Sequence, residues 1–172
     1  MSGPGTDGKL GVQRVVSGGQ TGVDRAALEV SLGLGIPCGG WCPRGRRAED
    51  GPIPARYPLC ETPSREYPQR TAWNVRDADA TLAITRGPLR GGTALTVRLA
   101  ARSGKPCLVV DLASESALSG VREWLEDQKV RVLNVAGPRE SENPGIGEQA
   151  SRFLSIVLSS TERGRHENAW LR

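Results

Sequence analysis

The fold is decided near the start of the chain by residues 13–34, which read QRVVSGGQTGVDRAALEVSLGL. This segment begins with a short branched apolar run, Gln13–Ser17, which is typical of a strand buried on both faces. A glycine-rich loop follows, and Val23–Leu34 then carries apolar residues at helical spacing. A buried strand, a glycine loop and a helix in this order indicate the first unit of a parallel α/β sheet.

The same alternation continues through the rest of the chain. Further strands are expected at Gly35–Gly40 (a weaker pattern), Ala80–Thr85, Pro106–Asp111 and Val130–Val135. Further helices are expected at Arg70–Ala78, Ala94–Ser103, Glu115–Gln128 and Ile146–Ser159. We therefore predict an α/β fold: a single Rossmann-like, doubly wound domain with a roughly five-stranded parallel sheet and helices on both faces. It would occupy residues 13–160, between a flexible arm at 1–12 and a charged tail at 161–172.

One long segment, Trp41–Pro68, breaks this alternation. It has no sustained period, prolines recur along it, and its first part carries Arg44, Arg46 and Arg47. A connection of this length inside a compact domain is usually a functional loop or disordered. Two interpretations stay open at this point, an ordered lid over a ligand or a solvated insertion.

Composition excludes several kinds of chemistry. The 172 residues include one histidine, His166, so a histidine base for a Ser or Cys nucleophile is not expected. The four cysteines do not complete a tetrahedral zinc set, and we expect reduced thiols and no metal held by the protein itself. No stretch resembles a membrane span or a signal peptide, which favours a cytoplasmic protein without a membrane partner. A net charge of +4 is too mild to predict a nucleic-acid partner.

Two glycine-rich loops are candidates for binding an anion. The first, after the 13–17 strand, contains Gly18, Gly19, Gln20, Thr21 and Asp24. The second, after the Ala80–Thr85 strand, contains Gly91, Gly92 and Thr93. Each precedes a helix, and the free amides at a helix start form a site for a group such as phosphate. Two such starts on adjacent strands could hold one anion from both sides, although each loop could equally be a tight turn with a helix cap.

Two further segments could reach the same crevice. Asn134 would leave the end of the Val130–Val135 strand, and Arg139 in the loop behind it could add charge. Arg70 and Asn74 lie four residues apart on one helical face, so they could contact a ligand or pair with each other. The first loop matches neither the dinucleotide-binding nor the triphosphate-binding glycine pattern, which removes the usual support for hydride transfer and triphosphate hydrolysis.

Several blocks of this sequence together resemble the molybdenum cofactor carrier proteins. The blocks are SGGQTGVDR (17–25), GGWCPRGRRAEDG (39–51), YPL (57–59), RT (70–71), DATL (79–82), GGT (91–93) and NVAGPR (134–139), and they occur in the same order. That family is similar to a wider Rossmann-like nucleotide-binding superfamily, which includes phosphoribohydrolases of the lysine-decarboxylase-like type.

The resemblance implies a binding or carrier function for a phosphorylated anionic ligand, with molybdenum cofactor as the expected ligand and a nucleotide or phosphate as the alternative. It also implies a homo-oligomer, a dimer or tetramer, and molybdoenzymes as possible partners. Arginines of the 44–47 block would neutralise the rest of the ligand, since guanidinium groups match oxyanions. The expected binding residues are Gly18, Gly19, Gln20, Thr21, Asp24, Arg44, Arg46, Arg47, Arg70, Asn74, Gly91, Gly92, Thr93 and Asn134, with no catalytic residue assigned.

An enzymatic function is the alternative interpretation. The phosphoribohydrolases of the wider superfamily carry a glutamate three residues after the threonine of their glycine motif. Here no acid follows Thr93 until Asp111, so carrying that activity over to this chain is not supported. A nucleotide-processing enzyme with Asp24 or Asp79 as acid or base stays open, as does a nucleotide-sensing module, while the balance of the sequence favours binding without catalysis.

Overall fold

A computed structural model describes residues 11–159 of the chain. The predicted charged tail and all but two residues of the predicted arm lie outside this range. The helices are α1 (Val23–Leu34), α2 (Tyr67–Asp77), α3 (Gly91–Arg102), α4 (Val121–Asp127) and α5 (Ile146–Ser159). The strands are β1 (Arg14–Val16), β2 (Cys38–Gly39), β3 (Trp41–Cys42), β4 (Arg47–Ala48), β5 (Gly51–Pro52), β6 (Cys60–Glu61), β7 (Ala80–Thr85), β8 (Cys107–Asp111) and β9 (Val132–Ala136).

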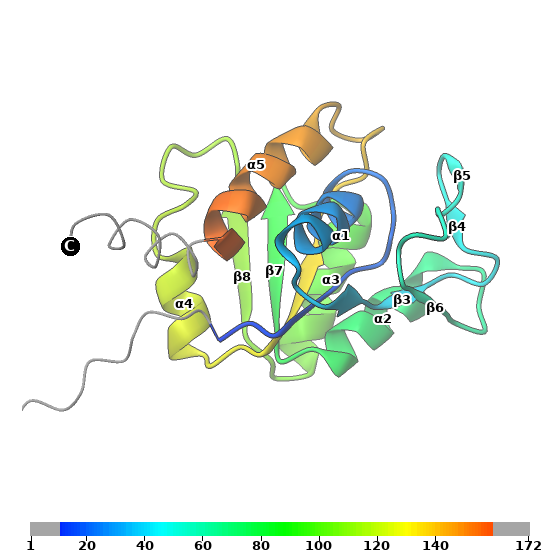
Figure 1. Cartoon of the computed structure of the whole chain (residues 1–172), viewed down its shortest axis with the longest axis horizontal. Helices are drawn as coiled ribbons and strands as arrows, with labels where there is room; N and C mark the ends of the chain where they lie inside the picture. Colours follow the sequence, from blue (N-terminus) through cyan, green and yellow to red (C-terminus); the bar gives the residue numbers. More distant parts are fainter. Residues whose placement is uncertain (1–10, 160–172) are drawn as a thin grey trace, which may run out of the picture.

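The main sheet has five parallel strands in the order β2-β1-β9-β7-β8. From β1 the chain moves outward to β2, and from β7 it moves outward in the other direction to β8. Strand β9 lies between β1 and β7 (Figure 1). The predicted Rossmann-like α/β fold is therefore confirmed. The strand order reverses around β9, and this brings the carboxyl ends of β1, β9 and β7 together, where ligands bind in open parallel sheets.

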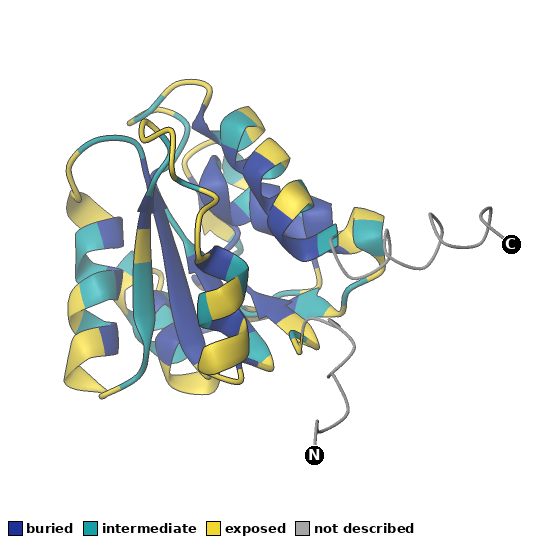
Figure 2. Ribbon diagram, turned by 90° about the vertical axis from the view of Figure 1, so that its left-hand side faces the viewer, coloured by how far each residue is buried: buried dark blue, intermediate teal, exposed yellow. Residues whose placement is uncertain are grey.

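Helices cover both faces of this sheet (Figures 1 and 2). One face carries large aliphatic side chains such as Leu82, Ile84 and Leu133, and they form one apolar cluster with residues of α1, α4 and α5. The opposite face carries small or polar buried residues such as Ala83 and Asn134, next to α2 and α3. The principal core therefore lies on the α1/α5 side, and the other side leaves polar groups below α2 and α3.

The observed elements differ from the expected ones mainly at their ends. The weak strand pattern at 35–40 forms only the two residues of β2. The helix expected from Glu115 begins at Val121, because Gly120 before it has a left-handed φ of 74° that interrupts helical geometry. By contrast, α3 begins three residues earlier than its apolar pattern suggested, at Gly91.

The segment 41–66 folds as an ordered unit beside α1, so the interpretation as a merely solvated insertion is wrong. It forms two small sheets, β3 with β6 and β4 with β5. A second apolar cluster of Leu28, Cys42, Ala48, Ile53 and Tyr57 attaches it to α1. Within residues 11–159, no helix is long and apolar enough to cross a membrane.

The division between core and surface along α5 gives a stability test. Ile146 is fully buried in the main core, whereas Ile156 on the same helix is 55% exposed. Ile146→Ala should lower the free energy of unfolding by about 2–5 kcal/mol, because it removes buried aliphatic volume. Ile156→Ala, the matched control, should change it by less than about 0.5 kcal/mol. Equal urea midpoints for the two variants would contradict the assignment of this core.

Candidate functional site

A cavity of about 330 Å³ lies at the carboxyl ends of the central strands, between α2 and α3. The residues around it come from six segments of the chain: the loop after β1, the first turn of α1, α2, α3, the end of β9 and the loop that follows β9. They are Gln20, Asp24, Tyr67, Pro68, Arg70, Thr71, Gly91, Gly92, Thr93, Leu95, Thr96, Arg98, Ala136, Gly137, Arg139 and Glu142. The volume is at the lower end of the range for small-molecule sites.

The first turn of α3 provides open hydrogen-bond donors to this cavity. Arg90 occupies the N-cap position without a side-chain cap, and the first helical amide bond runs from Ala94 to the Arg90 carbonyl. In the described part of the chain, the amides of Gly91, Gly92 and Thr93 have no acceptor, and neither has the Thr93 hydroxyl. Thr93 is only 5% exposed. Together with the positive end of the helix dipole, these donors favour an anion.

The start of α1 is different, because some of its donors are already used within the protein. The amide of Gln20 donates to Oδ2 of Asp24 (3.2 Å), and the amide of Val23 donates to the carbonyl of Pro138 (3.2 Å). Gly22 lies against this carbonyl so closely that a Cβ would overlap it. The two helix starts are therefore not equivalent, because the Pro138 carbonyl occupies that of α1.

A buried ion pair replaces the open amides on the β1 side. Asp24 is 3% exposed, and its Oδ2 accepts a hydrogen bond from Nη1 of Arg70 at 3.1 Å. Burial raises the pKa of Asp24, and the Arg70 guanidinium partly opposes this rise. The absence of a side chain at Gly18 gives Arg70 its space, since a Cβ there would overlap Nη1.

Three cations line the cavity, and two of them are paired. Arg70 is held by Asp24, and Nε of Arg139 lies 3.1 Å from Oε1 of Glu142. Arg98 has no partner among residues 11–159 and lies exposed at the cavity wall. The ring of Tyr67 lies within cation–π distance of Arg70 and Arg139, at 5.4 and 5.5 Å. The cavity is thus basic, with one cation unpaired.

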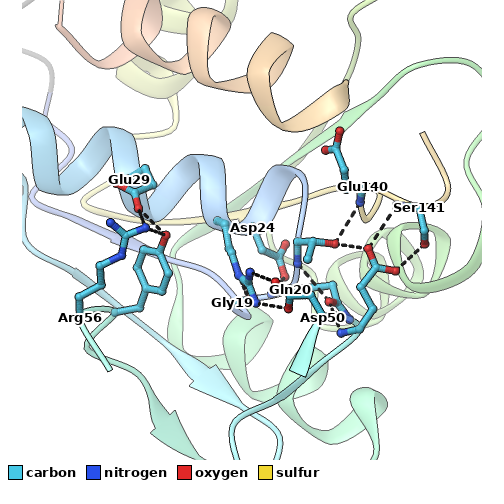
Figure 3. A network of polar contacts seen from close by, with 12 residues as sticks. Gly19, Gln20, Asp24, Glu29, Asp50, Arg56, Glu140 and Ser141 are labelled. Carbon is cyan, nitrogen blue, oxygen red and sulfur yellow. Dashed lines mark hydrogen bonds and ion pairs between the residues drawn. The ribbon is translucent and has the colours of Figure 1, made fainter. Parts of the chain in front are cut away.

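The 41–66 unit contacts the site through Glu49, although no residue of that unit lines the cavity. The backbone amide of Glu49 donates to Oε1 of Gln20 at 2.9 Å. Its carboxylate accepts hydrogen bonds from the hydroxyls of Thr21 and Ser141, which joins the unit to the loops after β1 and β9 (Figure 3). This unit therefore supports the cavity from the side.

Of the residues assigned to the site from sequence, the structure brings six to the cavity: Gln20, Asp24, Arg70, Gly91, Gly92 and Thr93. Gly18 lies under Arg70, and Gly19 packs against Ile53 and Leu59 of the 41–66 unit. Thr21 bonds to Glu49, and Asn134 donates to the hydroxyl of Thr81 at 3.2 Å. Asn74 exchanges hydrogen bonds with the backbone of Trp41. Ligand binding by all of the residues assigned from sequence stays a prediction.

The arginines of the 44–47 block also lie outside the cavity. The guanidinium of Arg46 donates to four carbonyls of its own segment, those of Ile53, Pro54, Tyr57 and Leu59. Arg47 donates to the carbonyl of Arg65 (3.1 Å), and the Arg44 side chain is exposed. These contacts give Arg46 a structural role in the 41–66 unit.

Other residues in the cavity were not assigned to it from the sequence patterns: Tyr67, Pro68, Thr71, Leu95, Thr96, Arg98, Ala136, Gly137 and Glu142. Helical spacing in α3 could have indicated some of these residues. Gly91, Leu95 and Arg98 are separated by four and three residues, which places them on one face of α3. Recognising that face requires knowing that α3 begins at Gly91, and the apolar pattern alone does not show this.

The cysteines do not take part in the cavity. Cys38, Cys42, Cys60 and Cys107 are all unpaired thiols, and none of them lines it. Burial raises the pKa of the Cys42 and Cys107 thiols. Among residues 11–159, no cluster of three or more His, Cys, Asp or Glu could hold a metal ion.

Comparison with known proteins gives one family and one close structural relative. Residues 15–158 match the model of the circularly permutated YpsA SLOG family. A solved structure from Syntrophus aciditrophicus, described as "Putative molybdenum carrier protein", shares 42% sequence identity and superposes with a TM-score of 0.85. The alignment covers 87% of this chain and 97% of that one. No curated protein matches the chain.

The role of Arg46 can be tested against its neighbour Arg44. We expect Arg46→Ala to accelerate amide hydrogen exchange across residues 47–60 by at least about tenfold, because up to four carbonyls lose their donor. Arg44→Ala removes the same charge from an exposed side chain and should leave exchange unchanged. Similar exchange in the two variants would contradict the structural role of Arg46.

The contacts of Glu49 predict a pH dependence of stability. Partial burial disfavours its charge, but hydrogen bonds from Ser141 and Thr21 outweigh this and lower its pKa below the ordinary value of 4.5. Its stabilising contribution is therefore present above about pH 4.5 and lost as the pH falls through the lower folded-state pKa. Glu49→Gln should reduce the acid-dependent loss of stability in urea titrations between pH 7 and 3. An unchanged profile would contradict this assignment.

Proposed function

The chain belongs to the circularly permutated YpsA SLOG family, and from this premise we propose that it is a carrier that binds a phosphorylated anionic ligand, molybdenum cofactor, without transforming it. The open first turn of α3 carries this proposal. Three amides without acceptors and the hydroxyl of Thr93 belong to residues that line the cavity there, and they match the oxygens of a terminal phosphate. The name of the structural relative, which describes a molybdenum carrier, is in keeping with a ligand that contains molybdenum.

The remaining cavity residues fit the other parts of such a ligand. Arg98 and Arg139 would neutralise negative charge beyond the phosphate, and Tyr67, Pro68 and Leu95 offer apolar contact to a ring. When bound, the cofactor would supply its own molybdenum, already ligated by its dithiolene. The protein's residues would bind the ligand, orient it and exclude water from part of its surface.

The positions of the candidate acids support binding over catalysis. Asp79 accepts hydrogen bonds from the amides of Arg131 and Val132, at the end of β7 opposite to the cavity. Asp24 is committed to Arg70 and to the Gln20 amide. Thr96, three residues after Thr93, donates to the Gly92 carbonyl at 2.8 Å, so a hydroxyl stands where the related hydrolases carry a glutamate.

Transfer to a molybdoenzyme and self-association as a dimer or tetramer are further parts of this proposal. Val109 on the edge strand β8 is 41% exposed, and Leu118 in the loop that follows β8 is 44% exposed. Such apolar side chains are suited to contact with another protein surface.

Substitution of one glycine tests the phosphate site. Gly92→Asp should abolish saturable retention of cofactor released from a molybdoenzyme under anaerobic conditions. It should also lower the affinity for inorganic phosphate by at least about tenfold, because the new carboxylate would occupy the free amides and repel the anion. An acidic residue in the first turn favours a helix, so folding should persist. Gly33→Asp, in an open position on α1, is the matched control.

Two results would count against the carrier. Absence of retention by the unmodified protein would contradict the cofactor as ligand. Release of free base from a panel of nucleotides, lost on Asp24→Asn, would favour the nucleotide-processing alternative.

A further inference from the structure

The side-chain amide of Gln20 has one possible orientation. Its Oε1 accepts hydrogen bonds from the backbone amides of Thr21 (3.1 Å) and Glu49 (2.9 Å). The flipped amide would direct its NH2 group at these two donors, so the positions of oxygen and nitrogen follow from the network. Nε2 is therefore fixed as a donor.

This donor has no acceptor among residues 11–159, although Gln20 is only 6% exposed and forms part of the cavity wall. Nε of Arg70, in the same wall, is a second buried donor without an acceptor. A buried polar group without a partner is destabilising, and native proteins rarely retain one without a function. Both residues line the same cavity and both donate to Oδ2 of Asp24, which makes a ligand in the cavity the candidate source of the missing acceptor.

The position of Gln20 separates this acceptor from the phosphate. Gln20 follows β1, and Gly91 follows β7, with β9 between the two strands. Two strand spacings amount to about 10 Å, so we take the phosphate at the first turn of α3 and the acceptor for Gln20 to be different groups. Both groups would belong to one ligand, because Gln20 and Gly91 line the same cavity.

We propose that Gln20 recognises a ring carbonyl of the ligand, which makes the ligand a phosphate monoester of an oxo-substituted heterocycle. A 4-oxo pterin and a 6-oxo purine both present this acceptor, whereas adenine presents an amino donor in its place. This inference rests on the proposed function, because it takes the phosphate to be bound at α3. The 41–66 unit contributes to specificity through the Glu49 amide, which holds Gln20 in the donating orientation.

Inosine monophosphate and adenosine monophosphate form the decisive pair of probes, since they differ at the 6-position by a carbonyl against an amino group. We expect the unmodified protein to bind the inosine nucleotide more tightly, by on the order of tenfold or more. A fluorescent, metal-free pterin phosphate prepared from oxidised cofactor forms a third arm, and the tighter of the two oxo probes identifies the natural heterocycle. Titration calorimetry and fluorescence report binding directly.

Variants of Gln20 separate recognition from folding. Gln20→Met keeps the volume and removes the donor, so the ratio of the two nucleotide affinities should fall to about one. Gln20→Glu keeps the oxygen that Thr21 and Glu49 contact and replaces the donor by an acceptor, so the ratio should invert in favour of adenosine monophosphate. Its added charge affects both nucleotides alike and cancels in the ratio. Gln128→Met, at the exposed C-cap of α4 and outside the cavity lining, should leave the ratio unchanged.

The outcomes distinguish this inference from the function on which it rests. Failure of inorganic phosphate to bind the unmodified protein overturns the phosphate site and therefore the proposed function. If phosphate binds, but adenosine monophosphate binds as tightly as the better oxo probe, the inference is overturned and the proposed function is not. A preference for the oxo probe that persists in Gln20→Met also overturns it, because the carbonyl would then be recognised by another group.

Discussion

The ion pair between Asp24 and Arg70 is the interaction around which the site is organised. It joins the first turn of α1 to α2 across the end of β1, and both side chains are largely withdrawn from water. Removing either partner would leave an uncompensated buried charge, which is far more costly than the pair itself. The same Asp24 oxygen accepts the Gln20 amide, so one carboxylate fixes both the loop after β1 and the guanidinium in the cavity wall.

The 41–66 unit shows how a segment without periodicity becomes ordered. Its backbone carbonyls cannot pair in long strands, and Arg46 satisfies four of them with a single guanidinium. Arg25 and Asp50 then form an ion pair that ties the unit to α1, in parallel with the contacts of Glu49 (Figure 3). The unit supports the cavity from outside, because it contacts wall residues such as Gln20 and contributes no residue to the wall itself.

Sequence patterns predicted the parts of the fold that depend on periodicity, and they were less informative where one residue type serves two purposes. Branched apolar runs located β1, β7, β8 and β9, because strands buried on both faces leave few alternatives. Both glycine-rich helix starts looked equally suited to an anion, but the Pro138 carbonyl occupies the start of α1, and a contact 115 residues away cannot be deduced locally. Arg46 looked like a ligand for oxyanions, since a guanidinium matches carbonyl oxygens as well as phosphate oxygens.

The charge balance of the cavity explains why the first turn of α3 matters more for an anion than the number of arginines. Arg70 and Arg139 are each compensated by a carboxylate, which leaves Arg98 as the cavity cation without a partner in the described chain. A phosphate dianion bound there would therefore depend on backbone amides and on the Thr93 hydroxyl for the rest of its stabilisation. Such donors do not titrate near neutral pH, and they need no histidine. The scarcity of histidine in this sequence is thus compatible with the proposed anion binding, because backbone amides would provide most of that site.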